Sequence, residues 1–224
     1  MSEFAAGPAG RIERVRALMA ERGYDAIVVR DEANLRWLTG VKGVFDYTFE
    51  FPHAAFITAD QCLFHTDSRY LNSFEENTPA GSPWVYDMDE GTIPGWVAGK
   101  IAANKCRVCA VEDDMQINFF QGIQRGLEDR SVACMLPLMH DDIRKMRAIK
   151  DAEEIELMRH AQSITDAAFQ HMLGFIKPGM TEKQVRNELE NFMFANGADS
   201  LAFGSIVASG PNTANPHAVP SDRV

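Results

Sequence analysis

The sequence lacks any long apolar run. No stretch of its 224 residues approaches the roughly 20 consecutive apolar residues that a helix needs to cross a bilayer. Residues 1–10 read as a loose leader with Gly and Pro, without the basic start and apolar segment of a secretory signal. We therefore expect no membrane association and a cytoplasmic location, where the four cysteines would be free thiols.

Basic residues are few relative to acidic ones. Asp and Glu number 32 against 22 Lys and Arg, which gives a formal net charge of -10. Most of such a surface repels a phosphate backbone, so we expect no nucleic-acid partner. Binding of a small cationic or neutral ligand is compatible with this charge, but net charge alone does not identify such a ligand.

Several short motifs with a defined chemical mechanism are also missing. The sequence contains no Gly-x-x-x-x-Gly-Lys-Ser/Thr, Gly-x-Gly-x-x-Gly, Gly-x-Ser-x-Gly or His-Glu-x-x-His. It shows no internal repeat either. Phosphate-loop, dinucleotide, serine-esterase and single-zinc peptidase chemistry therefore have no support from motifs.

Residues 1–145 are predicted to form an α/β domain with a mixed sheet, because strand and helix patterns alternate along them. Two of the strands form a hairpin around a turn at 59–61. The expected strands are 26–29, 53–58, 62–66, 85–86, 107–111 and 131–138. The expected helices are 11–22, a short helix through Tyr70 and Phe74, 93–103 and 118–127.

Residues 146–224 are predicted to begin a second, α+β domain. After a charged helical connector at 141–148, Asp151 with Glu154 and Thr181 with Gln184 resemble capping boxes that start two amphipathic helices. A strand at 201–207 and a polar, proline-rich loop at 209–224 follow. A lone strand cannot satisfy its ladder hydrogen bonds, so we expect its partners to come from a longer polypeptide or from another chain.

Cysteine and histidine pairs are weak candidates for metal or redox sites. Cys106 and Cys109 have the Cys-x-x-Cys spacing, but an offset of three within a strand places side chains on opposite faces, so two thiols in or beside a core are favoured. His53 and His65 would meet across the hairpin, and we interpret them as surface residues.

The other candidate residues, two helix histidines and three consecutive acids, can also be explained without a bound ligand. His160 and His171 lie eleven residues apart on the first long helix, too far to chelate one ion, and are expected at the helix surface or partly buried. Three consecutive acids, 112–114, follow a predicted strand end, where α/β proteins place sites. A solvated acidic turn is the favoured interpretation of them.

His217 is the strongest candidate residue. It lies between Pro216 and Pro220, which restrict the backbone and would hold the imidazole in one direction. A positioned histidine can donate a hydrogen bond to a substrate carbonyl or carry a proton. From the loop alone, this role and that of an ordinary loop histidine are both open.

Several segments together resemble the creatinase/prolidase/aminopeptidase P family, the pita-bread metallopeptidases. Their order and spacing cover nearly all of the chain. They are residues 34–40 (NLRWLTG), 66–70 (TDSRY), 147–155 (RAIKDAEEI), 178–182 (PGMTE), 203–207 (FGSIV), 209–212 (SGPN) and the Pro-His pair ending at His217.

The resemblance implies a creatinase-type N-terminal domain and an incomplete pita-bread domain. It implies a homodimer that hydrolyses the bond before a proline in the second position of a peptide, with two divalent ions, manganese, cobalt or zinc. In such enzymes the metal ligands follow the Pro-His segment, so this chain alone is expected to hold no catalytic metal and to be inactive. The resemblance assigns His217 a hydrogen bond to the substrate or the tetrahedral intermediate.

Two alternatives stay open beside an Xaa-Pro aminopeptidase or dipeptidase. Creatine-hydrolysing and sulfonium-cleaving relatives share the scaffold, so the fold does not decide the substrate. A non-catalytic protein that uses the first domain for dimerisation or ligand binding is the other alternative.

Overall fold

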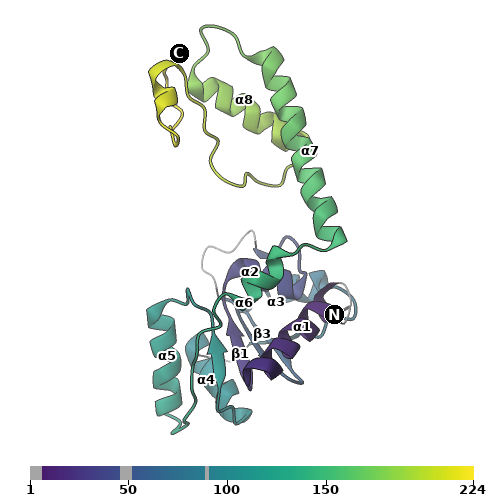
Figure 1. The fold of residues 1–224 in the computed structure, drawn as a ribbon, viewed down its shortest axis with the longest axis vertical. Coiled ribbons are helices and arrows are strands. Elements are labelled where there is room, and N and C mark those ends of the chain that lie inside the picture. The colour runs from purple at the N-terminus through teal and green to yellow at the C-terminus, as the bar shows by residue number, and fades with distance from the viewer. Residues whose placement is uncertain (1–6, 46–51, 89–90) are drawn as a thin grey trace. The chain divides into compact units, whose positions relative to one another are not determined.

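The computed structural model describes residues 7–45, 52–88 and 91–224 (Figure 1). The chain divides into two compact units, the first ending at Ile149 and the second beginning at Lys150. The expected leader is helical from Gly7 onward, and its first six residues lie outside the described ranges. Among the described helices, none is long and apolar enough to span a bilayer.

The first unit is built on a five-stranded mixed sheet in the order β4-β3-β2-β1-β5. The strands are β1 (Ala26–Val29), β2 (Ala54–Thr58), β3 (Cys62–His65), β4 (Val85–Asp87) and β5 (Cys109–Val111). The β2–β3 hairpin and the β1–β2 pair are antiparallel, whereas β5 joins β1 and β4 joins β3 in parallel. The predicted α/β fold with a mixed sheet is confirmed.

Helices cover both faces of this sheet (Figure 1). One face packs against α1 (Gly7–Arg22), α2 (Glu32–Thr39), α3 (Leu71–Asn77) and α6 (Asp142–Ala148), and the other against α4 (Ile93–Ala103) and α5 (Ile117–Glu128). Side chains of β1 alternate between the two cores: Ile27 and Val29 enter the first, Ala26 and Val28 the second. A strand buried on both faces explains why its sequence is continuously apolar.

The predicted strand at 131–138 is wrong as a regular strand. The segment runs beside β5 and makes two isolated parallel bridges, Val108 to Met135 and Val111 to Leu138. Between them the carbonyl of Pro137 accepts the Val111 N–H at 2.9 Å. Proline has no N–H to return to the ladder, so the pairing is interrupted there.

The second unit contains α7 (Ala152–Phe175), α8 (Glu182–Ala195) and a 3₁₀ helix, η2 (Gly210–Ala214). Both predicted capping boxes are present: Asp151 with Glu154 begins α7, and Thr181 with Gln184 begins α8. Helices α7 and α8 lie against each other (Figure 1). The predicted strand at 201–207 is wrong, because this segment pairs with no strand among the described residues.

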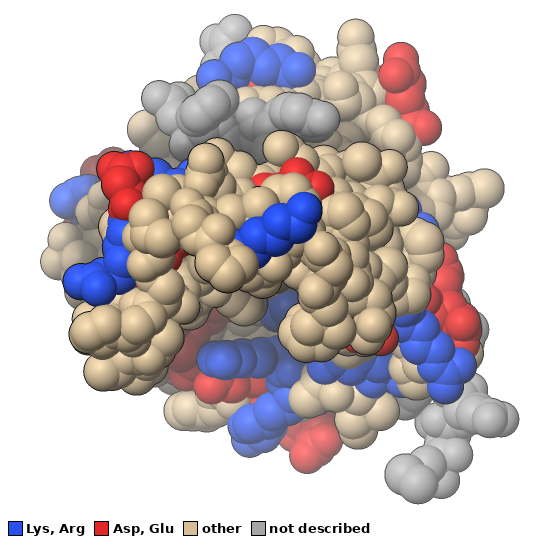
Figure 2. Space-filling model, turned by 90° about the horizontal axis from the view of Figure 1, so that it is seen from above, with Lys and Arg blue, Asp and Glu red and all other residues tan. Residues whose placement is uncertain are grey.

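Figure 2 shows charged side chains of both signs on the face that it presents. Uncharged residues cover much of that face, and Lys and Arg side chains are interspersed with Asp and Glu.

A polypeptide of residues 1–149 should fold independently. Both hydrophobic cores of the first unit lie within it, and helix α6 contributes Ile143 to one of them. We expect one cooperative thermal transition, followed by the fluorescence of the three tryptophans, Trp37, Trp84 and Trp96. A sloping, non-cooperative melt would contradict a boundary after residue 149. A shorter polypeptide ending at residue 145 cuts α6 and should melt at lower temperature.

Candidate functional site

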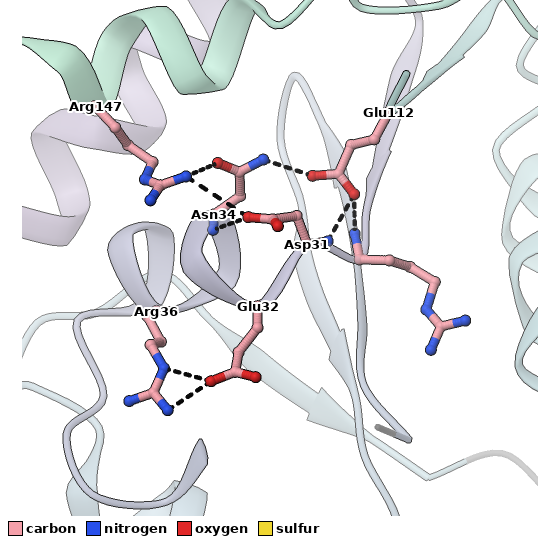
Figure 3. Close-up of polar contacts among 7 residues, drawn as sticks. Asp31, Glu32, Asn34, Arg36, Glu112 and Arg147 are labelled. Carbon is pink, nitrogen blue, oxygen red and sulfur yellow. Dashed lines mark hydrogen bonds and ion pairs between the residues drawn. The ribbon is translucent and has the colours of Figure 1, made fainter. Parts of the chain in front are cut away.

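The carboxyl ends of the parallel strands β1 and β5 meet at a buried carboxylate. Glu112 follows β5, and its Oε2 accepts the backbone N–H groups of Arg30 at 2.5 Å and Asp31 at 2.7 Å, just after β1. Its Oε1 accepts a hydrogen bond from Asn34 Nδ2 at 2.7 Å (Figure 3). One side chain thus joins the ends of two strands to the first turn of α2.

The same cluster reaches α6 through Arg147. Arg147 Nη1 donates to Asn34 Oδ1 at 2.7 Å and lies 3.6 Å from Asp31 Oδ1 (Figure 3). Asp31 is also the N-cap of α2, because its Oδ1 accepts the Asn34 N–H at 2.7 Å. Glu112 is therefore the buried end of a chain of polar contacts that connects β5, α2 and α6.

The interpretation of residues 112–114 as a solvated acidic turn is wrong for the first of them. Glu112 is 5% exposed, whereas Asp113 and Asp114 are exposed. Burial raises the pKa of Glu112 to about 7, and the hydrogen bonds from Asn34 and the two N–H groups oppose that rise. The available signal was its place directly after a buried strand that parallels β1.

A cavity of about 340 Å³ adjoins this cluster. Its lining includes Asp31, Asn34, Glu112 and Arg147. The inner wall is polar, but the hydrogen bonds of the cluster already engage these side chains with one another. The arrangement acts first as a structural connection between the strand ends and α6.

The hairpin histidines are buried, so their interpretation as surface residues is wrong. His53 is 0% exposed, and its ring packs edge-on against the rings of Phe45 at 5.7 Å and Phe74 at 5.0 Å. Burial lowers the pKa of His53 to about 4, so the ring is neutral at physiological pH. His65 is 6% exposed and packs against Trp96. Both rings belong to the core on which this unit depends.

The cysteines are free, and the Cys-x-x-Cys pair is buried as expected. The expectation that the two side chains lie on opposite faces of a strand is wrong: Cys106 and Cys109 enter the same hydrophobic core. The alternation of side chains along a strand does not apply here, because Cys106 precedes β5. It lies in a turn where its N–H donates to the Ile101 carbonyl at 3.0 Å. Burial raises the pKa of Cys106 to about 11 and raises that of Cys109 well above its usual range, so neither is a ready nucleophile.

The two α7 histidines are in the predicted environments. His160 is exposed. His171 is partly buried, with Nε2 2.7 Å from Glu188 Oε1 and its ring stacked on Phe192 at 4.4 Å. This contact helps to hold α7 against α8.

His217 lies exposed on the loop that follows η2. Its neighbour Ala218 and the nearby Pro220 are buried, so the loop packs against the second unit on the C-terminal side of His217. Within the described ranges, the imidazole makes no hydrogen bond to another residue. The ring therefore lies at the surface of the second unit, and its predicted contact with a substrate stays a prediction.

The ends of this loop are tied to the first turn of α8. The backbone N–H groups of Glu182 and Lys183 donate to the carbonyls of Arg223 at 2.9 Å and Ser221 at 3.1 Å. The Glu182 carboxylate in turn accepts hydrogen bonds from Ser209, Asn212 and Ser221. These bonds, led by those from Asn212 and Ser221, lower the pKa of Glu182 to about 2. Sequence reasoning assigned Glu182 to a helix start and missed this second role.

The comparison with known proteins assigns the class. Residues 11–149 match the family model "Creatinase/Prolidase N-terminal domain", and residues 156–224 match "Metallopeptidase family M24", which is metal-dependent. The chain belongs to the creatinase/prolidase family.

Particular relatives extend the similarity over both units. The chain is 30% identical over 221 residues to the uncharacterized peptidase YqhT of Bacillus subtilis, covering 96% of this chain and 57% of that protein. It is similar to the solved Xaa-Pro dipeptidase from Bacillus anthracis, with a TM-score of 0.80 and 31% identity over 95% of this chain and 56% of that one. The X-Pro aminopeptidase of Thermotoga maritima gives a TM-score of 0.77 at 27% identity, over 95% of this chain and 56% of that one. The chain thus spans a little over half the length of these relatives.

Proposed function

We propose that this chain is the N-terminal portion of a peptidase that hydrolyses the bond before proline, of the Xaa-Pro dipeptidase or aminopeptidase class. The similarity to the Bacillus anthracis dipeptidase carries the proposal, because it extends over 95% of the chain at 31% identity. The two segments matched by the family models support a creatinase-type domain followed by the first part of a metallopeptidase domain. The proposed assembly is a cytoplasmic homodimer.

His217 is proposed to meet the substrate. Its exposed ring lies on a loop that is buried at Ala218 and is bonded to α8 through Ser209 at one end and through Ser221 and Arg223 at the other. An imidazole held in this way can donate a hydrogen bond to the oxygen on which negative charge develops during attack on a peptide carbonyl. The substrate would be a peptide with proline in its second position.

The residues described do not fit the two divalent metal ions of such peptidases. Across the described ranges, no group of three or more His, Cys, Asp or Glu side chains is placed to hold an ion. Manganese, cobalt or zinc would therefore need ligands from other residues of the functional protein, and the part assigned to the described residues is substrate contact through His217.

The deciding experiment uses the protein at the length that its gene encodes. Its intact mass from the native source comes first, and we expect a value well above 25.0 kDa. The purified protein is then assayed with Xaa-Pro dipeptides and longer Xaa-Pro peptides, with matched Xaa-Ala peptides and creatine as controls. We expect cleavage before proline that a chelator removes and added manganese restores.

Other outcomes of this assay would contradict the proposal. Turnover of creatine or of a sulfonium compound without cleavage of Xaa-Pro peptides would assign a different reaction to the same scaffold. A native mass near 25.0 kDa together with no peptide cleavage would favour a binding or dimerisation role.

A further inference from the structure

The carboxylate of Glu182 gathers hydrogen bonds from residues on both sides of His217. Oε1 accepts from the Ser209 N–H at 2.7 Å and from Asn212 Nδ2 at 2.9 Å. Oε2 accepts from the N–H of Ser221 at 3.0 Å and from its hydroxyl at 2.7 Å. His217 lies between Asn212 and Ser221 in the sequence, so a single side chain holds the segments before and after it.

The chemistry of these contacts requires a carboxylate. Every one of them is a donation into a Glu182 oxygen, and an ionised carboxylate offers acceptors on both of its oxygens. A glutamine offers one acceptor oxygen, and its NH₂ group would face donors on the other side. The negative charge also lies in the first turn of α8, where the helix dipole favours it.

Within the described residues, the part of the loop nearest His217 forms no long-range hydrogen bond of its own. Between residues 212 and 220 its backbone bonds are local turns, Asn215 N–H to Asn212 and Ala218 N–H to Asn215, at 3.0 Å and 3.2 Å, and its long-range backbone bonds to α8 are confined to Ser221 and Arg223 at the C-terminal end. Such turns set the local shape of the loop, but they do not set where the loop lies on the second unit. The carboxylate of Glu182, which is 2% exposed, connects the segments on both sides of His217 to α8, whereas the backbone bonds to α8 hold only the C-terminal end.

We propose that Glu182 is a positioning residue that holds the loop of residues 209–223 so that His217 is presented in one place. That His217 meets substrate rests on the proposed function; that Glu182 anchors the loop does not. The two parts are therefore tested separately.

The first test measures amide hydrogen exchange in the 224-residue chain. In Glu182→Gln, exchange at the Ser209 and Ser221 amides should rise on the order of tenfold, because both lose a charged acceptor. The matched control is Glu190→Gln, which makes the same change on α8 at a carboxylate paired with Arg186 instead of the loop. Exchange within the helices α7 and α8 should stay unchanged in both variants.

A second variant keeps this test decisive if Glu182→Gln does not fold. Asn212→Ala removes a donor from the loop and leaves the first turn of α8 intact, and it should raise exchange at Ser209 by a smaller factor. Unchanged exchange at Ser209 and Ser221 in a folded Glu182→Gln, or an equal rise in Glu190→Gln, would overturn the anchoring role.

The second test is a double-mutant cycle in the protein at its encoded length. If Glu182 acts through His217, Glu182→Gln should lower kcat for an Xaa-Pro peptide on the order of 10-fold to 100-fold with little change in KM. The same change should have no further effect in a His217→Ala background. Multiplicative losses in the double mutant would mean that Glu182 has a general structural role instead.

The two proposals can fail independently of each other. A protein without peptidase activity would contradict the proposed function, and the amide exchange would still decide whether Glu182 anchors the loop. An active protein whose Glu182→Gln variant shows wild-type exchange and wild-type kcat would overturn the positioning role and leave the proposed function in place.

Discussion

Glu112→Gln should remove a loss of stability that the first unit otherwise shows as the pH rises from about 4.5 to about 7. Burial raises the pKa of Glu112 from 4.5 to about 7, so within this window the folded protein keeps a proton that the unfolded chain has released. Stability then falls as the pH rises, because the folded state binds more protons than the unfolded state. One pKa unit corresponds to about 1.4 kcal/mol, so the full effect is about 3 kcal/mol.

Denaturant unfolding at several pH values between 4 and 8 measures this effect. Tryptophan fluorescence reports the first unit, because Trp37, Trp84 and Trp96 all lie in it. The control is Asp114→Asn, which removes an exposed carboxylate two residues away and should keep the wild-type slope. Parallel stability curves for the wild type and Glu112→Gln would contradict a pKa near 7.

Glu112→Ala separates the role of the hydrogen bonds from that of the charge. It leaves the Arg30 and Asp31 N–H groups and the Asn34 amide without the acceptor that Glu112 provides. Orphaned buried donors cost about 1–3 kcal/mol each when they find no water, so this variant should be destabilised at every pH. The connection from Asn34 to Arg147 should weaken with it.

Local patterns in the sequence predict much of the fold. The apolar run of β1, the hairpin of β2 and β3, and both capping boxes occur where expected, because each depends on residues that are close in the sequence. The alternation of these elements was enough to predict a mixed α/β sheet.

Features set by distant residues were not predictable in the same way. His53 and Glu112 are polar, and polar residues are usually exposed, but here the aromatic cluster and the ends of two strands enclose them. The strand at 201–207 failed for a related reason: its apolar residues suit a sheet, but strand formation depends on a partner. Pro137 was a local signal against a regular strand at 131–138, and it was outweighed by the apolar pattern around it.

In the candidate site too, features that depend on neighbouring residues were predictable and features that depend on distant residues were not. The flanking prolines of His217 indicated a stiff loop that holds the imidazole in one direction, but they did not indicate that the ring is exposed. The anchoring by Glu182 was not predictable, because Ser209, Asn212 and Ser221 lie 27, 30 and 39 residues from it. Its position in the first turn of α8, directly after the N-cap Thr181, explains its place in the sequence without indicating its contacts.

His217→Ala, made in the protein at its encoded length, should lower kcat/KM for an Xaa-Pro peptide on the order of 100-fold to 1,000-fold. Removal of one hydrogen-bond donor to a developing oxyanion has an effect of this size. Because the proposed bond strengthens as charge develops, kcat should carry most of the loss and KM should change little. The thermal unfolding of the protein should stay unchanged, since the ring is exposed.

Two further variants test whether a loss of kcat/KM in His217→Ala comes from the hydrogen bond that His217 is proposed to donate. His160→Ala removes an exposed histidine from α7 of the same unit and should keep full activity. His217→Gln keeps a donor at a similar reach and should recover part of the rate that His217→Ala loses, which a merely steric role for the ring would not predict. If His217→Ala behaved like His160→Ala, His217 would be an ordinary loop residue, and the substrate contact would have to come from elsewhere in the protein.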